Sequence, residues 1–532
     1  MRTISHELQM SFSICAGSSS KNSALKCASW LMAIGCLSVA ALFALQYDKS
    51  LNLMDEGYLW YGAQRTALGE VPLRDFMSYD PGRYYVSAAY MGLVGDRGII
   101  TLRVVLALVQ AGGLITALYV LAKGSNKQDR AFWILAAVVF LTWMIPRHKM
   151  FDLSISIVLV AALSWLLERP SNRRSFASGI IIGVVAVMGR NHGLYAGASF
   201  VLALILCFVG SRDFSALTQR LLSLGAGVCI GYSPLLIMIV AVPGFAEAFW
   251  QSIQFLFQQE ATNIPLPVPW PWRWDPAPSA PIETTQRLLI GLFFLALPTF
   301  LAATAAGILR TGRIDLSTRP QLAASCLLSI PYTHFAFSRA DLSHLAQGIF
   351  PMLIGVILVL QNARPIVKWS LGITLLTASM LATKSLHPAT TCWETRCHTV
   401  QIAQTSLLLP ERGAKDVQMI LDVVAHHAPH GEPFFAAPFL PGAYAMLERK
   451  SPVWEIYALF PRSPDFERKE IERLRNAQPR LVVISHAPIG GPGRSFVSTH
   501  PLTQTFIDDH FDLIPEASDA SFSVYESRSP RS

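Results

Sequence analysis

The sequence predicts a polytopic α-helical membrane protein with a small α/β domain at its C-terminal end. Of its 532 residues, 52% are hydrophobic and only 15% are charged, and the mean hydropathy is +0.39. A soluble protein of this length needs a more polar surface, so lipid must be the solvent for most of the chain. The apolar residues also occur in separate runs of about 20, the length of helix that crosses the hydrocarbon of a bilayer.

These runs predict about eleven membrane-spanning helices within residues 26–385. The first runs from Lys26 to Leu45. The others begin near Ile99, Ala131, Leu153, Phe176, Leu194, Leu221, Arg287, Gln321, Leu345 and Trp369. The first run lacks a small-residue cleavage site and many more follow it, so we expect an uncleaved helix preceded by a cytoplasmic tail, residues 1–25.

Basic residues in alternate short connections predict the orientation, because Lys and Arg are retained on the cytoplasmic side. These residues are Lys123, Lys127, Arg130, Arg169, Arg173, Arg174, Arg212, Arg220, Arg310, Arg313, Arg319, Arg364 and Lys368. The N-terminus is then cytoplasmic and the C-terminus is outside. The net charge of +8 follows largely from this arrangement, and no nucleic-acid partner is expected.

The cysteines separate into two kinds by their surroundings. Those in apolar runs are expected to pack in the core: Cys36, Cys207, Cys229 and Cys326. Cys392 and Cys397 instead lie in the external segment CWETRC. An oxidising compartment favours a disulfide there, although a short loop also accommodates two free thiols.

Three external segments are too long to be simple connections: residues 46–98, 243–286 and 386–532. In the first, helical spacing predicts helices over residues 57–68 and 83–94, and we expect both to lie in the membrane interface. Its aromatic residues are typical of a belt at the lipid headgroups. They are Tyr58, Trp60, Tyr61, Tyr84 and Tyr85.

An acidic pair, Asp55 and Glu56, comes directly after the first apolar run. A carboxylate near the lipid boundary loses hydration, which raises its basicity and suits it to act as a general base. The simpler interpretation is a solvated helix cap, because Asp begins helices well.

Other external helix ends also carry unusual polar residues instead of neutral turns. The segments are PRHKMFD at 146–152, GRNHGLY at 189–195 and THFAFSRADLSH at 333–344. Basic residues outside contradict the usual charge distribution, so a buried anionic group such as a phosphate is the simplest partner. Mutual pairing is the alternative, for example Arg339 with Asp341 or Lys149 with Asp152. The repetition in three loops favours the phosphate, which Arg holds through two parallel hydrogen bonds.

These residues resemble those of a known family. The segments MDEGYLWYGAQR and RDFMSYDPGRYY are similar to the first external loop of GT-C integral membrane glycosyltransferases, in the branch of the protein O-mannosyltransferases and the lipid A aminoarabinose transferases. RNHGLY and SRADLSHL resemble segments of bacterial relatives in that branch. The resemblance covers nearly the whole chain.

The resemblance implies a bacterial inner-membrane enzyme with its C-terminal domain in the periplasm. The enzyme would transfer a sugar with inversion from a polyprenyl phosphate to a lipid, glycan or protein acceptor. Asp55 then matches the catalytic acid of the first loop, with Glu56 beside it, and Asp152 occupies a second acidic position that Asp341 shares. Arg339 matches a donor-phosphate ligand. The other candidate phosphate ligands are Lys149, Arg190, Arg147, His148, His192 and His344.

Metal dependence stays open, because the chain lacks the second motif of the DxD type that some members carry. A divalent metal is therefore not assigned, and no other cofactor is expected. Trp270, Trp272 and Trp274 lie in a Pro-rich stretch of the second long loop. This stretch is either a lid over the site or an anchor in the headgroups.

After residue 385 the composition becomes that of a soluble domain. Patterning predicts helices over residues 415–428 and 464–477 and strands over residues 433–437, 481–485 and 522–527. His426, His427 and His430 are interpreted as a solvated helix end. We expect this domain to cap the membrane site or to select the acceptor.

Two other classes of function remain as alternatives. A transporter or flippase of lipid-linked glycans needs many spans, but it usually carries charges near the bilayer midplane and internal repeats, which are not evident here. A polymerase or ligase with a lipid pyrophosphate donor would depend on the Arg and His residues and not on Asp55.

Overall fold

The computed structural model describes residues 21–125, 129–258, 263–273, 281–310, 316–487 and 495–528. Lys127, Arg313, Trp274 and most of the expected cytoplasmic tail lie outside these ranges. The chain separates into two compact units. Unit 1 is Met1–Leu45, Leu106–Leu236 and Pro265–His387, and unit 2 is Gln46–Val105, Ile237–Ile264 and Pro388–Ser532.

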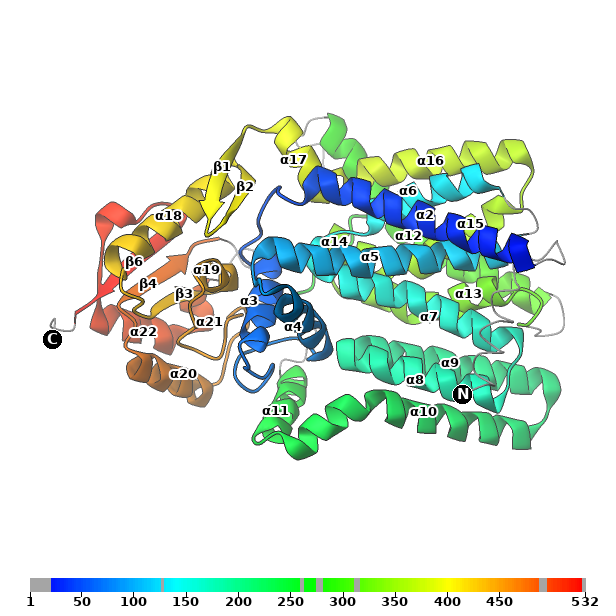
Figure 1. Ribbon diagram of the computed structural model, residues 1–532, viewed down its shortest axis with the longest axis horizontal. Helices are drawn as coiled ribbons and strands as arrows, with labels where there is room; N and C mark the ends of the chain where they lie inside the picture. The colour runs from blue at the N-terminus through cyan, green and yellow to red at the C-terminus, as the bar shows by residue number, and fades with distance from the viewer. Residues whose placement is uncertain are drawn as a thin grey trace. The chain divides into compact units, whose positions relative to one another are not determined.

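Long apolar helices that run side by side make up unit 1 (Figure 1). They are α2 (Lys21–Gln46), α5 (Ile99–Lys123), α6 (Arg130–Trp143), α7 (Met150–Glu168), α8 (Asn172–Met188), α9 (Arg190–Ser211), α10 (Phe214–Ala241), α12 (Pro281–Arg310), α13 (Pro320–Ser338), α14 (Leu342–Gly348), α15 (Phe350–Gln361) and α16 (Pro365–Thr383). The short 3-10 helices η2 (Arg147–Lys149) and η3 (Lys384–Leu386) complete the unit. The first turns of α5 and the last residues of α10 are counted with unit 2.

The chain is a multi-pass membrane protein, but the count of about eleven spans is not confirmed. Seven helices within the described ranges are long and apolar enough to cross a membrane, or up to eight if the bent pair α14 and α15 forms one span. Helix α6 has only 14 residues, which extend about 21 Å at 1.5 Å per residue, whereas the hydrocarbon is about 30 Å thick.

Helix α7 is the most buried of the candidate spans, with 83% of its apolar window inside the protein. It packs against α8, α9, α13, α14 and α15. Because the neighbouring helices cover α7 on most sides, side chains in its first turn are held by protein and not by lipid. This burial positions Asp152, which lies in the first turn of α7.

Helices α8 and α10 are in backbone contact through two pairs of glycines spaced four residues apart. A Cβ atom on Gly179 of α8 would lie 2.1 Å from the Leu224 carbonyl oxygen. A Cβ atom on Gly227 of α10 would lie 2.0 Å from the Phe176 carbonyl oxygen. Gly183 and Gly231 repeat the arrangement one turn later. Small residues with this spacing allow membrane helices to approach closely.

The expected core packing of the cysteines is only partly correct. Cys326 is buried, but Cys36 and Cys229 are exposed on α2 and α10. Apolar helices in lipid carry apolar residues on every face, so an apolar run does not predict which face turns inward. The disulfide between Cys392 and Cys397 is confirmed, with the two Cα atoms 5.4 Å apart.

Unit 2 contains the first external loop, and its two expected helices are found as α3 (Asp55–Ala67) and α4 (Gly82–Val94). The aromatic belt expected there is largely wrong. Tyr58, Trp60, Tyr61 and Tyr84 are at most 3% exposed, and only Tyr85 reaches 40%. Their rings fill the contacts of α3 with α4 and with α19 (Pro441–Met446) of the C-terminal residues.

The second long loop contains a helix that we did not predict, α11 (Phe245–Gln258). Its apolar residues at helical spacing are a signal that was available in the sequence. Of the Pro-rich stretch, residues 263–273 form no helix or strand. There the Trp270 and Trp272 rings stack with centroids 5.1 Å apart, and Trp270 lies 6.0 Å from the Phe337 ring of α13. Both interpretations of the Pro-rich stretch, a lid over the site and an anchor in the headgroups, stay open.

The C-terminal residues form an α/β structure around a four-stranded sheet. Strands follow the order β3 (Phe434–Ala437), β4 (Leu481–Ser485), β6 (Phe522–Ser527), β5 (Phe511–Leu513). The β3 and β4 strands are parallel, and the other pairs are antiparallel. A hairpin of β1 (Cys397–Ile402) and β2 (Thr405–Pro410) precedes the sheet. The helices are α17 (Pro388–Glu394), α18 (Glu411–His427), α20 (Pro464–Ala477), α21 (Phe496–Thr499) and α22 (Pro501–His510), with the 3-10 helix η4 (Pro515–Ala517).

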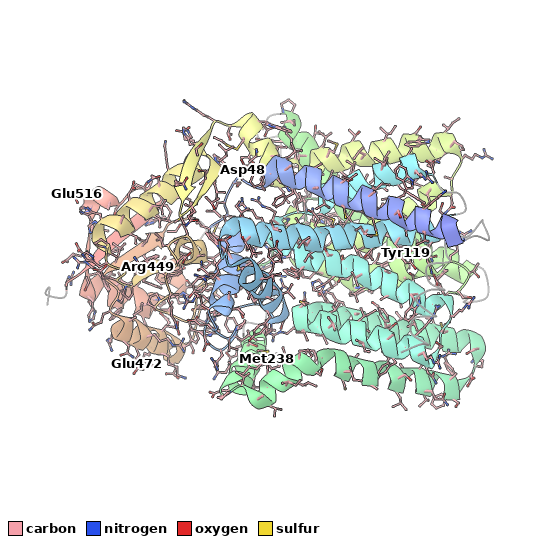
Figure 2. The ribbon with its side chains drawn as sticks, in the orientation of Figure 1. Asp48, Tyr119, Met238, Arg449, Glu472 and Glu516 are labelled. Atoms are coloured by element: carbon pink, nitrogen blue, oxygen red, sulfur yellow. A yellow bond between two sulfur atoms is a disulfide. The ribbon has the colours of Figure 1, made fainter. Side chains whose placement is uncertain are left out.

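Every helix and strand predicted after residue 385 is present, although α18 begins and ends earlier than expected. The hairpin, α17, α19, α21, α22 and β5 were missed. The core of this structure includes Phe435, Val482, Ile484 and Ile507. Charged side chains cover its outside, among them Glu472 and Glu516 (Figure 2).

Candidate functional site

Asp55 is the first residue of α3 and follows the apolar helix α2 by nine positions. Asn52 caps the start of this helix: its Oδ1 accepts hydrogen bonds from the backbone N–H groups of Met54 and Asp55, at 2.9 and 3.0 Å. The capping oxygen is therefore supplied by Asn52, not by Asp55 as the simpler interpretation expected. Asp55 is half-buried.

Glu56 is buried and held by Arg103, which is the fifth residue of α5. Arg103 donates from Nε to Oε1 and from Nη2 to Oε2, each at 2.9 Å. The same guanidinium donates to the backbone oxygens of Tyr47 and Ser50, each at 2.6 Å. A bidentate pair of this kind fixes direction as well as charge. Glu56 was predicted as catalytic, but this geometry suits it to orienting the start of α3.

An aromatic cluster lies one turn along α3 from Asp55. The Tyr58 ring meets those of Tyr79 and Tyr457 edge-on or tilted, with centroids 4.9 and 5.6 Å away. The Tyr457 ring packs 4.3 Å from that of Phe439, and the Arg83 guanidinium lies 5.0 Å from the Tyr79 centroid. Burial, with smaller contributions from neighbouring tyrosines, raises the pKa of Tyr58 well above its ordinary value. Tyr58 therefore stays neutral at any physiological pH.

In unit 1, a buried chain of hydrogen bonds connects three helices. His192 on α9 lies 2.9 Å from Asp152 Oδ1 through Nε2 and 2.7 Å from the Tyr332 hydroxyl through Nδ1. His192 and Tyr332 are fully buried, and Asp152 is 5% exposed. In one consistent arrangement, Nε2–H donates to the carboxylate and the Tyr332 O–H donates to Nδ1. Both ring nitrogens are thus used, which argues against the predicted phosphate contact of His192.

Arg339, Asp341 and His344 are also brought together in unit 1, between α13 and α14. Asp341 Oδ2 accepts from Arg339 Nε at 2.7 Å, and its Oδ1 lies 2.8 Å from His344 Nδ1. Asp341 also caps α14 by accepting from the His344 backbone N–H. Burial alone would raise the pKa of Asp341, but the hydrogen bonds and charge of His344, with Arg339, lower it to about 2. The mutual pairing considered for Arg339 is therefore present, through Nε.

The remaining predicted phosphate ligands lie at the starts of two helices of unit 1. Arg147, His148 and Lys149 form η2 directly before α7, and Arg190 is the first residue of α9. His148 is buried, while the other three are half-buried. The contact of His192 with Asp152 shows that the first turns of α9 and α7 adjoin, so these basic residues lie in the part of unit 1 that also contains Asp152.

Sequence reasoning missed two functional candidates, Arg103 and Tyr332. An arginine inside an apolar run is itself a signal, because a charge there needs a buried partner. Tyr332 carries no such signal, since one tyrosine in an apolar helix is ordinary. No group of three or more His, Cys, Asp or Glu residues that could hold a metal ion is found in the part of the chain that the structure describes.

No protein-family model matches the sequence, and no curated protein sequence matches it. Among solved structures, the chain is similar to ArnT from Cupriavidus metallidurans in the apo state, with 14% identity over 93% of this chain and 97% of that chain and a TM-score of 0.54. It is similar to the same protein bound to undecaprenyl phosphate, with 14% identity, coverage of 93% and 98%, and a TM-score of 0.57. The oligosaccharyltransferase of Archaeoglobus fulgidus, tethered with an acceptor peptide, matches at 11% identity over 94% of this chain and 74% of that chain, with a TM-score of 0.44. The two ArnT structures establish the fold.

Proposed function

Because the chain has the fold of the GT-C membrane glycosyltransferases, we propose that it transfers a sugar from a polyprenyl-phosphate-linked donor to a hydroxyl group of an acceptor. The ArnT structure with undecaprenyl phosphate supports a donor of this class. The acceptor is a lipid, glycan or protein at the external face of the inner membrane. The single observation that carries the proposal is the position of Asp55. It follows the first apolar helix and begins α3, next to Glu56, which is paired with Arg103.

Asp55 is the general base in this proposal. The acceptor oxygen attacks the anomeric carbon while its proton passes to the Asp55 carboxylate. The bond between the anomeric carbon and the phosphate oxygen breaks, and polyprenyl phosphate leaves as an anion. Attack from the face opposite the leaving group inverts the anomeric configuration. Glu56 acts as a positioning residue, because its buried pair with Arg103 holds the start of α3.

The leaving phosphate needs cations, and we propose Arg339, Lys149, Arg190 and Arg147 in that order of preference. In Arg339 the bond to Asp341 uses Nε, so the terminal Nη groups are the ones that would reach phosphate. His148 and His344 are secondary candidates. Donors already directed at the phosphate stabilise the charge that develops as the bond breaks, an effect worth about 3 kcal/mol per donor in other enzymes.

The decisive experiment compares three purified variants in an assay of sugar transfer from polyprenyl-phosphate sugars. Asp55→Asn should lower kcat by roughly 100-fold or more, and Asp55→Glu should retain part of the rate. Asp75→Asn is the matched control, because Asp75 is a carboxylate of the same loop that pairs with Arg74. Each variant must show the thermal midpoint of the wild type. Wild-type rates in Asp55→Asn would reject the base assignment.

The proposal also requires Asp55 and Arg339 on the same side of the membrane. We expect a reporter enzyme that is active only outside the cytoplasm to be active when fused after Gly98 and after Ala340. Fusions after Gly124 and after Asn362 should be inactive. Reporter activity at only one of the first two positions would put Asp55 and Arg339 on opposite sides of the membrane and would contradict the proposal.

A further inference from the structure

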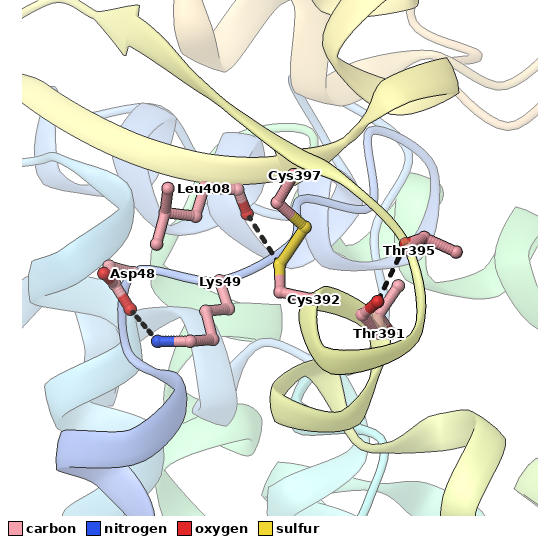
Figure 3. Close-up of a disulfide and its surroundings, with 7 residues drawn as sticks. All are labelled: Asp48, Lys49, Thr391, Cys392, Thr395, Cys397 and Leu408. Carbon is pink, nitrogen blue, oxygen red and sulfur yellow. Dashed lines mark hydrogen bonds and ion pairs between the residues drawn. A yellow bond between two sulfur atoms is a disulfide. The ribbon is translucent and has the colours of Figure 1, made fainter.

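The segment between α2 and α3, residues 47–54, is held by the C-terminal residues of unit 2. Asp48 O accepts from the Leu408 N–H at 2.8 Å, and Ser50 N–H donates to Leu408 O at 2.8 Å. Lys49 thereby forms a parallel bridge with Leu408. This single bridge lies on the edge of β2 opposite its pairing with β1. Figure 3 shows Asp48 and Lys49 beside Leu408.

The β2 strand is itself anchored close to this contact. Its partner β1 begins at Cys397, whose disulfide connects it to Cys392 of α17. Cys392 Sγ lies 3.9 Å from Leu408 O, the atom that accepts from Ser50. Leu408 is therefore held from one side by the hairpin and its disulfide, and it holds the loop segment on the other (Figure 3).

A second contact lies closer to Asp55 and consists of backbone against backbone. The Gly442 N–H of α19 donates to Leu53 O at 2.8 Å. A Cβ atom on Gly442 would lie 2.8 Å from both the Cα and the carbonyl oxygen of Leu53. A Cβ atom on Gly57 would lie 2.4 Å from Gly442 N. No larger residue fits at either glycine without moving the main chain.

These contacts bracket the proposed base. Leu53 lies two positions before Asp55 and Gly57 two positions after it, and Gly442 contacts both. A domain that only covered the site or selected an acceptor would not need main-chain contact on both sides of Asp55. We propose that the C-terminal residues of unit 2, through Gly442 and Leu408, position Asp55 for proton transfer. This inference rests on the proposed function and deepens it.

The test is the Gly442→Ala variant of the full-length protein, because the added methyl must displace Leu53 or Gly57. We expect kcat to fall by roughly 10- to 100-fold, since small displacements of a reacting group have effects of that size. The KM for the polyprenyl-phosphate sugar should stay within about twofold, since Gly442 contacts Leu53 and Gly57 of unit 2, whereas the proposed phosphate ligands belong to unit 1. Gly413→Ala is the matched control, since the nearest atom to its Cβ would be 4.0 Å away.

A positioning role is separated from a loss of stability by combining Gly442→Ala with Asp55→Asn. If Gly442 acts through Asp55, the substitution lowers kcat in the wild type but leaves the residual rate of Asp55→Asn unchanged. An equal loss in both backgrounds, or a wild-type kcat in Gly442→Ala, would overturn the inference. Wild-type activity of Asp55→Asn itself would instead reject the proposed function.

Leu408→Pro provides a second route if Gly442→Ala does not yield folded protein. It removes the N–H that donates to Asp48 O and adds no bulk against Leu53. The same loss of kcat is expected, again absent in the Asp55→Asn background. Hydrogen exchange at Ser50 should become faster at the same time. Unchanged kcat and unchanged exchange would overturn the inference.

Discussion

Arg103 and Glu56 are 47 positions apart in the chain and form a fully buried bidentate ion pair. The pair joins the second turn of α5 to the first turn of α3, and Arg103 also donates to the Tyr47 and Ser50 carbonyl oxygens. One guanidinium thus contacts the segment that leads to Asp55 at Tyr47 and Ser50, and contacts α3 just after Asp55 at Glu56.

Removing one member of this pair should lower the free energy of unfolding more than removing both. Arg103→Met leaves the buried Glu56 carboxylate without its guanidinium partner and should lower the free energy of unfolding by about 3–5 kcal/mol. The double variant Arg103→Met/Glu56→Leu should be less destabilised, because no buried charge remains. Thermal unfolding in detergent measures the difference. Strict additivity of the two single changes would contradict a coupled pair.

The hydrogen-bonded chain in unit 1 predicts that substitutions at its members lower the free energy of unfolding by unequal amounts. Its members are Asp152, His192 and Tyr332. His192→Phe removes the bond to the buried Asp152 carboxylate and should cost about 3–5 kcal/mol. Tyr332→Phe removes one hydroxyl and should cost about 1 kcal/mol. Tyr195→Phe is the control, since that ring lies beside His192 but outside the hydrogen-bonded chain. Equal stability of His192→Phe and the control would rule out a structural role for the chain.

The contact of α8 with α10 predicts opposite outcomes for two glycines two positions apart. Gly227→Ala places a methyl against the Phe176 carbonyl and should destabilise the protein by about 1–3 kcal/mol. Gly225→Ala meets nothing within 4 Å and should be neutral or slightly stabilising, because alanine favours helix. Matched thermal midpoints of the two variants would contradict the close approach.

The lowered pKa of Asp341 predicts a pH dependence of stability. Its pKa of about 2 lies below the ordinary 3.8, so the folded state favours the carboxylate. Ionised Asp341 therefore stabilises the fold above about pH 4, and this contribution is lost as the pH falls toward about 2. Wild type should exceed Asp341→Asn in thermal midpoint near neutral pH, and the gap should narrow over that interval. A gap of constant size from neutral pH down to about pH 2 would contradict the lowered pKa of Asp341.

Patterning alone predicted α20, β4 and β6 with the bounds that the structure has. These segments have a strong periodicity, or an apolar run that is buried on both faces of the sheet. The same method missed α19, whose six residues are all buried. Six residues are too few for a helical period to show, and only contact with α3 stabilises them.

For the site, the sequence indicated individual residues but not their partners. Asp55 and Asp152 were predicted as site residues from their places beside apolar runs. The pair of Arg103 with Glu56 depends on a contact between helices that are far apart in the chain. The same is true of His192, which joins Asp152 to Tyr332. Such partners are set by packing, and packing is not encoded in any local window.

By itself, the sequence determined that this chain enters a membrane, the approximate places of its apolar helices, and which polar residues lie near their ends, because transfer of side chains into lipid depends on composition and length. Only the tertiary structure decided which helix faces are buried and which carboxylates are paired. It also decided that the C-terminal residues bracket Asp55. Those choices follow from close packing of backbone and side chains that are far apart in the chain.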